Sequence, residues 1–529
     1  MQIAFDCVPT LPKLAWLATV DLTTSLVSVA HGSGVETAGT FFVEGAWDGP
    51  FAEGDFANTA CLFGTGGGTD GADAWFASST ATTDYLYYHS TPQRVSVANS
   101  LPLLLASRRV RLDPMFDGYD AINESIMRGI NGYLADIPTT ADPIRRLMHR
   151  NLRVSQSGVV ERDKDLPPPF PTFEAYYEYL SAAYGRIASN ARDAARRRAL
   201  AIYSTQSRGY DTTAVNAIAA RHGVDKAFTV TRGKKAGSFV DREEGEAPND
   251  DGTQIAAALG IPSDPIERRA FAGGFATEDL YYACLDQNQD FNMHQMTERM
   301  DRVGLLLTGT LGELWYSRQS YEEYMRRYDL IDDTLKRVDL GGHGLAEVRL
   351  EVGFIQAAVP YIGARRRPDI FAITESDAMD PWRLKNHYDR PIPRRIAETA
   401  GLPRSMFGQT KIASVVQFSP PALPIGESLR SAYFDFLIEN RLLAPWQLRL
   451  FPVVHRVNSI LWFAGEGRHA WIHYAQRAIS KVLRRDYRFS LWWQRLSGRL
   501  FCFCVNRRAD QLFAALRSAA PDARTLSPP

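Results

Sequence analysis

Residues 1–157 alternate short apolar runs with polar turns, and the apolar runs are rich in aromatic and β-branched side chains. Glycine, aspartate and serine separate the runs, a pattern typical of strands. The predicted strands are Leu14–Val20, Leu26–Val29, Thr40–Val43, Thr59–Phe63, Ala74–Ala77, Tyr85–Tyr88 and Val95–Ala98. The glycine-rich run 64–71 lies between two of them, and no helical pattern follows it. We therefore interpret this run as a hairpin connection rather than a phosphate-binding loop.

The segment 158–172 is charged and then rich in proline, ending in Pro167-Pro168-Pro169-Phe170-Pro171. Because proline lacks an amide hydrogen and fixes its own backbone angle, this segment is predicted to be a linker. Thr172 can then cap a helix, and a helical pattern runs from about Phe173 to Arg196.

Beyond Arg198 the apolar pattern alternates between strand and helix periods. Strands are predicted at Ala199–Tyr203, Ala227–Val230 and Val303–Leu307, and helices at Asp211–His222 and 250–260. Alternation of this kind favours a parallel sheet covered on both faces. After about residue 420 the pattern is mainly helical. The predicted organisation is a β-rich α+β domain (1–157), a linker (158–172), an α/β parallel-sheet domain (173–420) and a helical C-terminal region (421–529).

Composition narrows the class of protein. Lys plus Arg and Asp plus Glu both number 60, so the chain lacks the basic excess of many nucleic-acid binders, and no nucleic-acid partner is expected. Five cysteines in 529 residues exclude a disulfide scaffold and fit a reducing compartment. No targeting segment is evident, and no apolar run reaches the ~20 residues of a membrane-spanning helix. We expect a soluble cytoplasmic protein without a membrane partner.

The stretch 204–215 carries the clearest chemistry, because a turn with hydroxyls and a glycine joins a predicted strand to a predicted helix. Ligands of open α/β sheets bind beyond the carboxyl ends of strands, and a helix N-terminus favours phosphate. The candidate phosphate-binding residues are Ser207, Arg208, Gly209, Tyr210, Asp211, Thr212 and Thr213. Asp211 would repel phosphate unless a cation lies between them, so its predicted role is to hold Mg²⁺. The same string also fits a capped helix with Asp211 as the cap, and the residues alone leave both interpretations open.

The string Ser207-Arg208-Gly209-Tyr210-Asp211-Thr212 resembles the PP-loop, S-G-G-x-D-S, of asparagine synthetase-like ATP pyrophosphatases. Further segments resemble the same family in the same order: 251–260, Thr308-Gly309-Thr310-Leu311-Gly312-Glu313, 389–395 and Phe407-Gly408-Gln409-Thr410-Lys411. The resemblance implies an adenine nucleotide hydrolase-like fold that binds ATP and Mg²⁺. It also implies that Gly309 contacts the nucleotide, that Glu313 is a second metal ligand beside Asp211, and that Asp211 and Lys411 act in catalysis.

The segments 84–88 and 99–105 are similar to the end of the glutaminase-type domain that precedes this synthetase domain. The family's nucleophilic cysteine is the mature N-terminal residue, whereas this chain has Gln2 there and its first cysteine at Cys7. We therefore expect a degenerate glutaminase-like domain without glutamine hydrolysis. Thr310 and Leu311 also replace a glutamate and a glycine of the family's later loop.

The implied reaction is an ATP-dependent ligation. A substrate carboxylate would be adenylated with release of pyrophosphate, and a nitrogen nucleophile would then displace AMP. The partners would be a small-molecule or peptide carboxylate and an amine donor, either free ammonia or an amine within the substrate. A non-catalytic nucleotide- or partner-binding relative is the alternative, and a nitrile-forming relative is a third. The oligomeric state is open, a homo-oligomer included.

Two arginine-rich regions have open interpretations. Arg365-Arg366-Arg367 and Arg390, Arg394 and Arg395 could bind an acidic substrate or form local ion pairs. The basic stretch 481–508, with Trp492, Trp493 and Phe501, could contact a nucleic acid or a membrane surface, but we favour an amphipathic helix with its aromatic side chains in the core.

Overall fold

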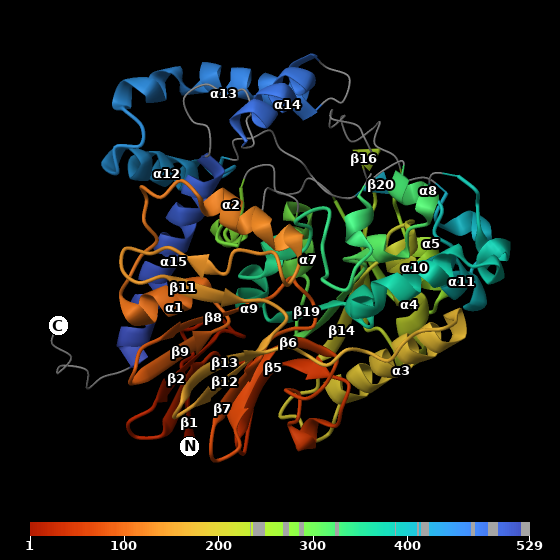
Figure 1. Ribbon diagram of the computed structural model, residues 1–529, viewed down its shortest axis with the longest axis horizontal. Helices are drawn as coiled ribbons and strands as arrows, with labels where there is room; N and C mark the ends of the chain where they lie inside the picture. The colour runs from red at the N-terminus through yellow and green to blue at the C-terminus, as the bar shows by residue number, and fades with distance from the viewer. Residues whose placement is uncertain are drawn as a thin grey trace.

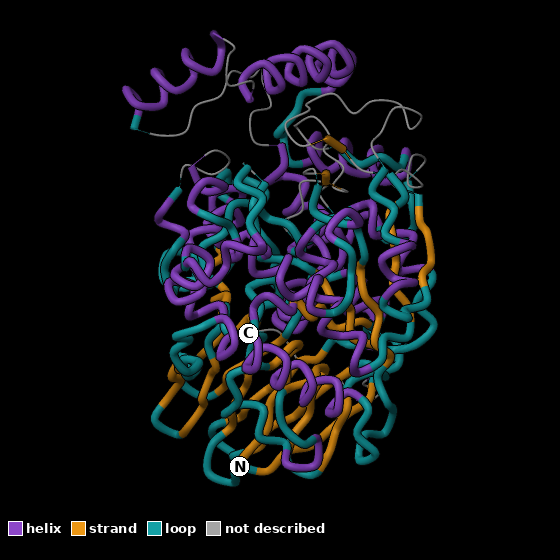
Figure 2. The backbone as a smooth tube through the Cα atoms, turned by 90° about the vertical axis from the view of Figure 1, so that its right-hand side faces the viewer, coloured by secondary structure: helices purple, strands orange, loops and turns teal. Residues whose placement is uncertain are grey.

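The computed structural model describes residues 1–232, 234–235, 249–267, 274–284, 290–322, 327–386, 388–409, 412–413, 423–466, 471–484 and 496–519. Strands gather in the lower half of the molecule and helices in the upper half (Figure 2). The molecule combines a first part built mainly of antiparallel strands, a separate parallel sheet and a helical C-terminal region (Figure 1). The predicted mixture of α/β and α+β structure is confirmed at this level.

The first part is a sandwich of two sheets. One has the order β1-β3-β2-β9-β8-β11-β10 and the other β13-β12-β7-β6-β5-β4. Their strands are β1 (Gln2–Cys7), β2 (Trp16–Asp21), β3 (Leu26–His31), β4 (Glu36–Ala38), β5 (Phe41–Trp47), β6 (Leu62–Thr69), β7 (Ala74–Ala77), β8 (Leu86–Ser90), β9 (Arg94–Ala98), β10 (Asp136–Ile137), β11 (Ile144–Leu147), β12 (Asn151–Ser155) and β13 (Gly158–Arg162). Between the sheets Trp16 packs edge-on against Phe42, with ring centroids 4.9 Å apart, and stacks on Phe76. Every predicted strand of this part overlaps an observed one.

Most of the glycine-rich run is not a hairpin connection, so that interpretation is wrong for residues 64–69; only residues 70 and 71 lie in the connection between β6 and β7. Residues 64–68 lie inside the fully buried strand β6, which pairs with β5 and β7. A Cβ atom on Gly67 would approach Phe76 to 2.5 Å, and one on Gly68 would approach Trp75 to 2.7 Å. The glycines therefore make room for aromatic side chains of neighbouring strands.

The predicted linker begins too early. Residues 158–162 form the edge strand β13, and only 163–172 lack regular structure. This stretch is fixed at its proline-rich end, because the Phe170 amide donates to Asp369 at 3.0 Å and Arg366 donates to the Pro167 carbonyl at 2.8 Å. Helix α3 (Phe173–Ala191) follows, and the Thr172 hydroxyl caps it as predicted, although the helix ends before Arg196.

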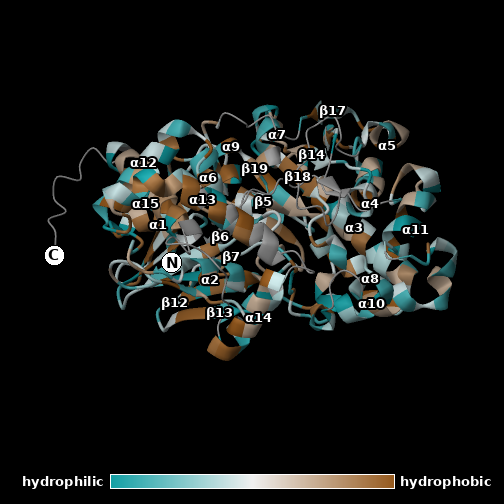
Figure 3. Cartoon of the chain, turned by 90° about the horizontal axis from the view of Figure 1, so that it is seen from above, coloured by the Kyte–Doolittle hydropathy of each residue, from teal (hydrophilic) through white to brown (hydrophobic). Residues whose placement is uncertain are grey.

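The second part contains the predicted parallel sheet. Its strands are β14 (Ala201–Thr205), β15 (Lys226–Val230), β17 (Ser263–Ile266), β18 (Gly304–Thr308) and β19 (Phe354–Ala358). All neighbours are parallel in the order β17-β15-β14-β18-β19, so the strand order reverses between β14 and β18. Helices α3 and α4 (Tyr210–Ala219) contact these central strands. Figure 3 shows hydrophobic stretches around β18 and β19, which are buried along their whole length.

The remaining helices pack around the sandwich and the parallel sheet or form the C-terminal region. They are α1 (Leu101–Arg108), α2 (Tyr119–Glu124), α5 (Thr253–Ala258), α6 (Glu278–Tyr282), α7 (His294–Glu298), α8 (Arg318–Ser320), α9 (Val348–Val352), α10 (Arg367–Glu375), α11 (Pro391–Thr399), α12 (Glu427–Glu439), α13 (Pro445–Glu466), α14 (Trp471–Leu483) and α15 (Leu496–Ala519). A short ribbon pairs β16 (Lys234–Lys235) with β20 (Ile412–Ala413). Within the described ranges, none of the helices combines the length and hydropathy that crossing a bilayer requires.

The C-terminal region is helical as predicted, and it is not a separate unit. Helix α15 returns to pack along α1 and α2 of the first part. Phe501 is buried there, which confirms the core interpretation for this residue, whereas Trp492 and Trp493 lie outside the described residues. Helices α13 and α14 form an outer layer of the molecule (Figure 1), where Trp446 and Trp471 are exposed.

The two sheet-containing parts share a buried ionic contact. Arg349 of α9 donates to Glu44 of β5 at 2.7 Å and pairs with Asp84 at 2.6 Å, and all three side chains are almost completely buried. One continuous hydrophobic core also runs through both parts. The first part is therefore packed against the parallel sheet rather than tethered to it.

Candidate functional site

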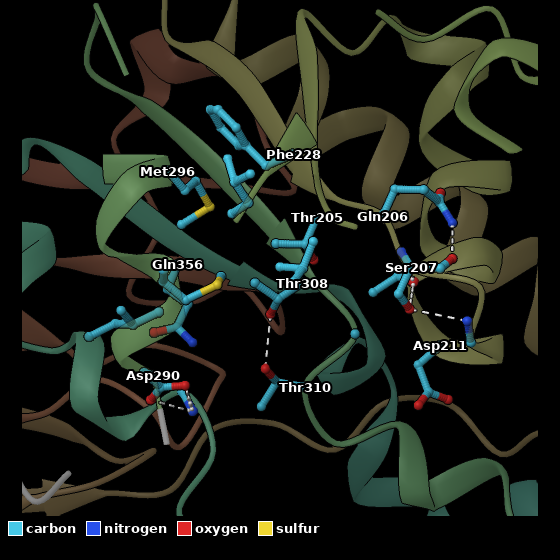
Figure 4. A pocket seen from close by; sticks show the side chains of 18 of the residues that line it. Thr205, Gln206, Ser207, Asp211, Phe228, Asp290, Met296, Thr308, Thr310 and Gln356 are labelled. Carbon is cyan, nitrogen blue, oxygen red and sulfur yellow. Dashed lines mark hydrogen bonds between the residues drawn. The ribbon is translucent and has the colours of Figure 1, made fainter. Parts of the chain in front are cut away.

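A cavity of about 210 Å³ lies beyond the carboxyl ends of the parallel strands, at the point where the strand order reverses (Figure 4). Its walls come from Thr205, Gln206, Ser207, Gly209, Asp211, Thr212, Phe228, Val230, Ile266, Asp290, Met293, Met296, Thr308, Gly309, Thr310, Gly342, Leu345, Gln356 and Tyr388. This is the place where open α/β sheets bind their ligands. The two loops singled out from the sequence, after β14 and after β18, both contribute to it.

The loop after β14 is held in shape by short-range hydrogen bonds. The Ser207 amide donates to the Thr212 hydroxyl at 3.0 Å, and the Gly209 amide donates to the Ser207 hydroxyl at 3.1 Å. The Arg208 amide donates to Asp250 at 3.1 Å. Helix α4 then begins after Gly209 without a side-chain cap. The backbone N–H groups of its first turn therefore have no capping side chain. Uncapped N–H groups at a helix N-terminus can donate hydrogen bonds to an anion.

Some predicted phosphate-binding residues line the cavity and others support the loop. Ser207, Gly209, Asp211, Thr212 and Gly309 line it, whereas Arg208, Tyr210 and Thr213 do not.

The supporting residues brace the loop from behind. The Tyr210 ring is buried against Tyr388, with centroids 4.9 Å apart, and its hydroxyl accepts a hydrogen bond from Arg394. The Thr213 hydroxyl donates to the Gly209 carbonyl at 2.7 Å. These side chains fix the loop and leave ligand contact to their neighbours.

Asp211 is the point where the two loops meet. A Cβ atom on Gly309 would lie 2.7 Å from Asp211 Cβ, and one on Gly312 would overlap the Asp211 carboxylate. Only glycine at these two positions lets the second loop approach so closely. The Asp211 side chain does not cap α4, so that alternative interpretation is wrong.

The Asp211 carboxylate is paired with Arg390, the residue that precedes α11. The Arg390 side chain is 1% exposed, and its guanidinium lies 4.1 Å from the Tyr316 ring centroid and 5.3 Å from that of Tyr388. The carboxylate itself is 22% exposed and reaches the cavity. Sequence inspection noted Arg390 only as one member of a basic cluster.

Glu313 follows Gly312, the glycine that approaches the Asp211 carboxylate, but Glu313 itself does not line the cavity. Burial raises the pKa of the Glu313 carboxyl, and Arg367 opposes this rise. Both carboxylates act on Tyr316, whose pKa burial raises to about 12, with Arg390 lowering it and Asp211 and Glu313 adding to the rise. In the described part of the chain, no three His, Cys, Asp or Glu side chains are grouped as a metal site.

The other sequence-derived residues have mixed outcomes. Lys411 lies outside the described residues, as does Thr410 beside it. Several members of the arginine clusters form local ion pairs: Arg365 with Asp333, Arg394 with Glu398, and Arg395 with Glu174. Within these clusters, Arg390 is the arginine whose ion-pair partner lines the cavity.

The rest of the cavity was not predicted. One wall is apolar and consists of Phe228, Val230, Ile266, Met293 and Met296. A second wall is polar and consists of Asp290, Thr308, Thr310, Gly342 and Gln356. Figure 4 shows Asp290, Thr308, Thr310 and Gln356 at the cavity.

Of these residues, Gln356 had a local signal in the sequence, as a polar residue within the apolar strand 354–358. Asp290 and Gly342 come from connections whose approach to the sheet has no local signature. Burial raises the pKa of the Asp290 carboxyl to about 7, although the amides of Gly342 and Gly344 donate to it at 3.0 and 3.1 Å.

Comparison of the sequence with known proteins gave no match. No protein-family model matches the chain, and no curated protein matches it at a significant level.

Proposed function

We propose that the protein is an ATP-dependent amide-forming ligase of the AMP-forming, PP-loop type. The observation that carries the proposal is the convergence of two loops on Asp211, at the strand-order reversal of a five-stranded parallel sheet. Reversal points of this kind are where such sheets bind nucleotides. The order of the PP-loop-like segments along the chain supports the same assignment.

The loop after β14 offers the groups that a polyphosphate needs. The first-turn amides of α4 and the hydroxyls of Ser207 and Thr212 are hydrogen-bond donors at a helix N-terminus. The apolar wall of Phe228, Val230 and Ile266 lies beside this loop and suits a flat base. In this arrangement the triphosphate contacts the loop and the adenine packs on the apolar wall.

The residues present fit a magnesium ion that arrives with the nucleotide, rather than an ion held by protein alone. Mg²⁺ in such sites takes one or two carboxylates and completes its shell with phosphates and water. Asp211 offers a carboxylate whose Oδ1 is bonded to Arg390. When bound, the ion would neutralise phosphate charge as pyrophosphate leaves. Glu313 contributes in this account through the electrostatic field at Tyr316 rather than from the cavity wall.

The proposed reaction forms an acyl-adenylate and then an amide. A substrate carboxylate attacks the α-phosphate, the bond to pyrophosphate breaks, and an amine then displaces AMP from the acyl carbon. Arg390, and Lys411 by the family resemblance, would offset the negative charge that builds on the phosphate. The amine comes, in this proposal, from ammonia or from the substrate itself.

A second candidate is a relative that binds a nucleotide without turnover. Two observations favour it: Arg390 already occupies an oxygen of Asp211, and Thr310 and Leu311 replace the family's glutamate and glycine. Leu311 has a left-handed backbone with φ at +71°, a conformation that glycine adopts readily and a leucine rarely does.

Isotope exchange separates the two candidates. Wild-type protein with ATP, Mg²⁺ and a carboxylate panel is expected to exchange labelled pyrophosphate into ATP, and Asp211→Ala is expected to abolish the exchange. Tight ATP binding without AMP formation would instead support the non-catalytic candidate. Gly49→Ala, in a connection of the first part outside the cavity wall, is a control for nonspecific effects.

A further inference from the structure

The polar wall of the cavity contains a buried side chain, Gln356, that makes no hydrogen bond to the described residues. Gln356 in β19 is 0% exposed, and neither its Nε2 nor its Oε1 has a hydrogen-bond partner among the described residues. Buried polar atoms in folded proteins are nearly always hydrogen-bonded, so an orphaned pair in a cavity wall indicates a ligand. Figure 4 shows this carboxamide at the cavity, on the side away from Ser207 and Asp211.

Gly342 and Thr310 lie beside the Gln356 carboxamide. A Cβ atom on Gly342 would lie 2.5 Å from Gln356 Nε2, so any side chain at position 342 would cover the amide. Thr308 donates to the Thr310 hydroxyl at 3.0 Å, which leaves the Thr310 hydrogen free to donate elsewhere. Both residues line the same cavity as Gln356.

The charge of this wall limits what can bind. None of the described residues that line the cavity is a lysine, arginine or histidine, while Asp211 and Asp290 have carboxyl groups. The α-carboxylate of a free amino acid would find no cation among these described residues, and at the Gln356 wall it would approach Asp290. A neutral group avoids this electrostatic penalty.

We propose that the Gln356 wall is a binding subsite for a neutral amide group of the substrate, and that Gln356 determines this specificity. An amide presents a carbonyl acceptor and an N–H donor in one plane, which match Nε2 and Oε1 of Gln356. The reacting carboxylate then belongs to an amide-bearing molecule, such as a peptide, rather than to a free amino acid. That the ligand is a substrate rests on the proposed function, whereas the assignment of an amide group rests on Gln356 alone.

An adenine edge has the same donor–acceptor pattern, but the sheet order argues against it. Gln356 is on β19, two strands from the phosphate loop of β14, whereas Phe228 and Val230 are on β15, on the other side of β14. A nucleotide whose base packs on the β15 side leaves the β19 side to the second substrate. The test below includes this alternative as an outcome.

Two probes that share the aspartate side chain and differ in their backbone groups test the subsite. One is N-acetyl-L-aspartate N-methylamide, which has two neutral amides and one carboxylate, and the other is free L-aspartate. Their dissociation constants are measured by ligand-observed NMR on the full chain, without ATP. Binding of Mg²⁺ with a non-hydrolysable ATP analogue is measured separately by calorimetry.

The capped probe is expected to bind more tightly than L-aspartate, and Gln356→Leu is expected to weaken it about tenfold or more, since two hydrogen bonds are lost. Gln356→Glu keeps the shape and removes a donor, so it should weaken the same probe. Gln476→Leu, at a buried glutamine of α14 outside the cavity wall, should leave binding unchanged. The affinity for the nucleotide analogue should be the same in all four proteins, and thermal unfolding reports whether each variant is folded.

Three results would overturn the subsite: tighter binding of L-aspartate, no binding of the capped probe, or loss of nucleotide rather than probe affinity in folded Gln356→Leu and Gln356→Glu. The last result would assign Gln356 to the base. If the capped probe binds through Gln356 while no pyrophosphate exchange occurs, the proposed function fails and the amide subsite stands.

Discussion

The Arg390 guanidinium donates a hydrogen bond to the Asp211 carboxylate, across 179 positions of the chain. Arg390 immediately precedes α11, and α11 packs against α4, the helix that begins with Tyr210 and Asp211. The ion pair therefore fixes the orientation of α11 relative to the loop after β14. It also places a permanent positive charge where a nucleotide's phosphates would lie.

Replacing Asp211 is expected to lower both pyrophosphate exchange and thermal stability. We expect Asp211→Asn to lower pyrophosphate exchange by about 100-fold or more, the size of effect seen when a key charged or polar group is removed from an active site. The same change leaves the buried Arg390 without its counter-ion, so the thermal unfolding temperature should fall. Exchange assays and scanning calorimetry measure the two effects.

The double variant Asp211→Asn/Arg390→Met is the matched control. It removes both charges, so it should recover part of the lost unfolding temperature and none of the exchange activity. An Asp211→Asn protein that exchanges pyrophosphate at the wild-type rate would contradict the role given to this carboxylate.

The contact between the two loops gives a second prediction. Gly312→Ala places a methyl group against the Asp211 carboxylate, so it should move that carboxylate and lower exchange strongly. The fold should persist, because the clash is with a partly exposed side chain. Activity and circular dichroism of Gly312→Ala are compared with those of Gly49→Ala. Unchanged activity in Gly312→Ala would show that the approach of the second loop to Asp211 is not needed.

Three strands of the parallel sheet, β14, β15 and β18, could be predicted because their signals are local, whereas β17 and β19 were not predicted. Apolar runs of strand length, the cap at Thr172 and the glycine after His222 are each read within a few residues. The glycine-rich strand β6 was misread because its glycines make room for Phe76 and Trp75 on the neighbouring strand. No local sequence pattern indicates that packing. The edge strand β13 was missed because its partner β12 supplies the pairing.

A buried lysine gives a prediction on pH dependence. Lys164 is 6% exposed, its Nζ donates to Asn151 Oδ1 at 2.8 Å, and burial lowers its pKa to about 7. An unfolded lysine titrates near 10.4, so between about pH 7 and 10 the unfolded chain binds more protons than the folded one. The contribution of Lys164 to folding stability should therefore rise with pH across this window, by at most about 1.4 kcal/mol per pH unit.

Lys164→Met isolates this contribution. At pH 7 the variant should be more stable than the wild type, and the difference should shrink toward pH 10, as measured by denaturant unfolding. Lys385→Met, at an exposed lysine, should show a difference that does not change with pH. A pH-independent difference for Lys164→Met would mean that Lys164 is not held at a lowered pKa.

The source of nitrogen gives a further prediction. Cys7 is exposed at the end of β1 and does not line the cavity. Cys7→Ala should therefore leave AMP formation unchanged, and glutamine should not replace the amine substrate. Glutamate release from glutamine that disappears in Cys7→Ala would contradict this expectation; chromatography of the reaction mixture detects it.

Only those residues of the candidate site that are neighbours within one loop could be predicted from the sequence. Ser207, Gly209, Asp211 and Thr212 follow one another, and their order with Gly309 is visible in the chain. Asp290 and Gln356 reach the cavity from distant segments, and Arg390 reaches Asp211 from another, so their convergence depends on the tertiary fold. Tyr210 and Thr213 are close to Asp211 in the sequence, yet they pack behind the loop while Asp211 lines the cavity. The spacing of these residues alone does not show this difference.

The account depends most on a nucleotide bound at the loop after β14 and cleaved between its α- and β-phosphates. The most direct measurement follows α-labelled ATP with Mg²⁺, the wild-type chain and a panel of amide-bearing carboxylates, with Asp211→Ala in parallel. The account predicts labelled AMP and pyrophosphate from the wild type and neither from the variant. Formation of labelled ADP, or equal amounts of AMP from both proteins, would contradict it.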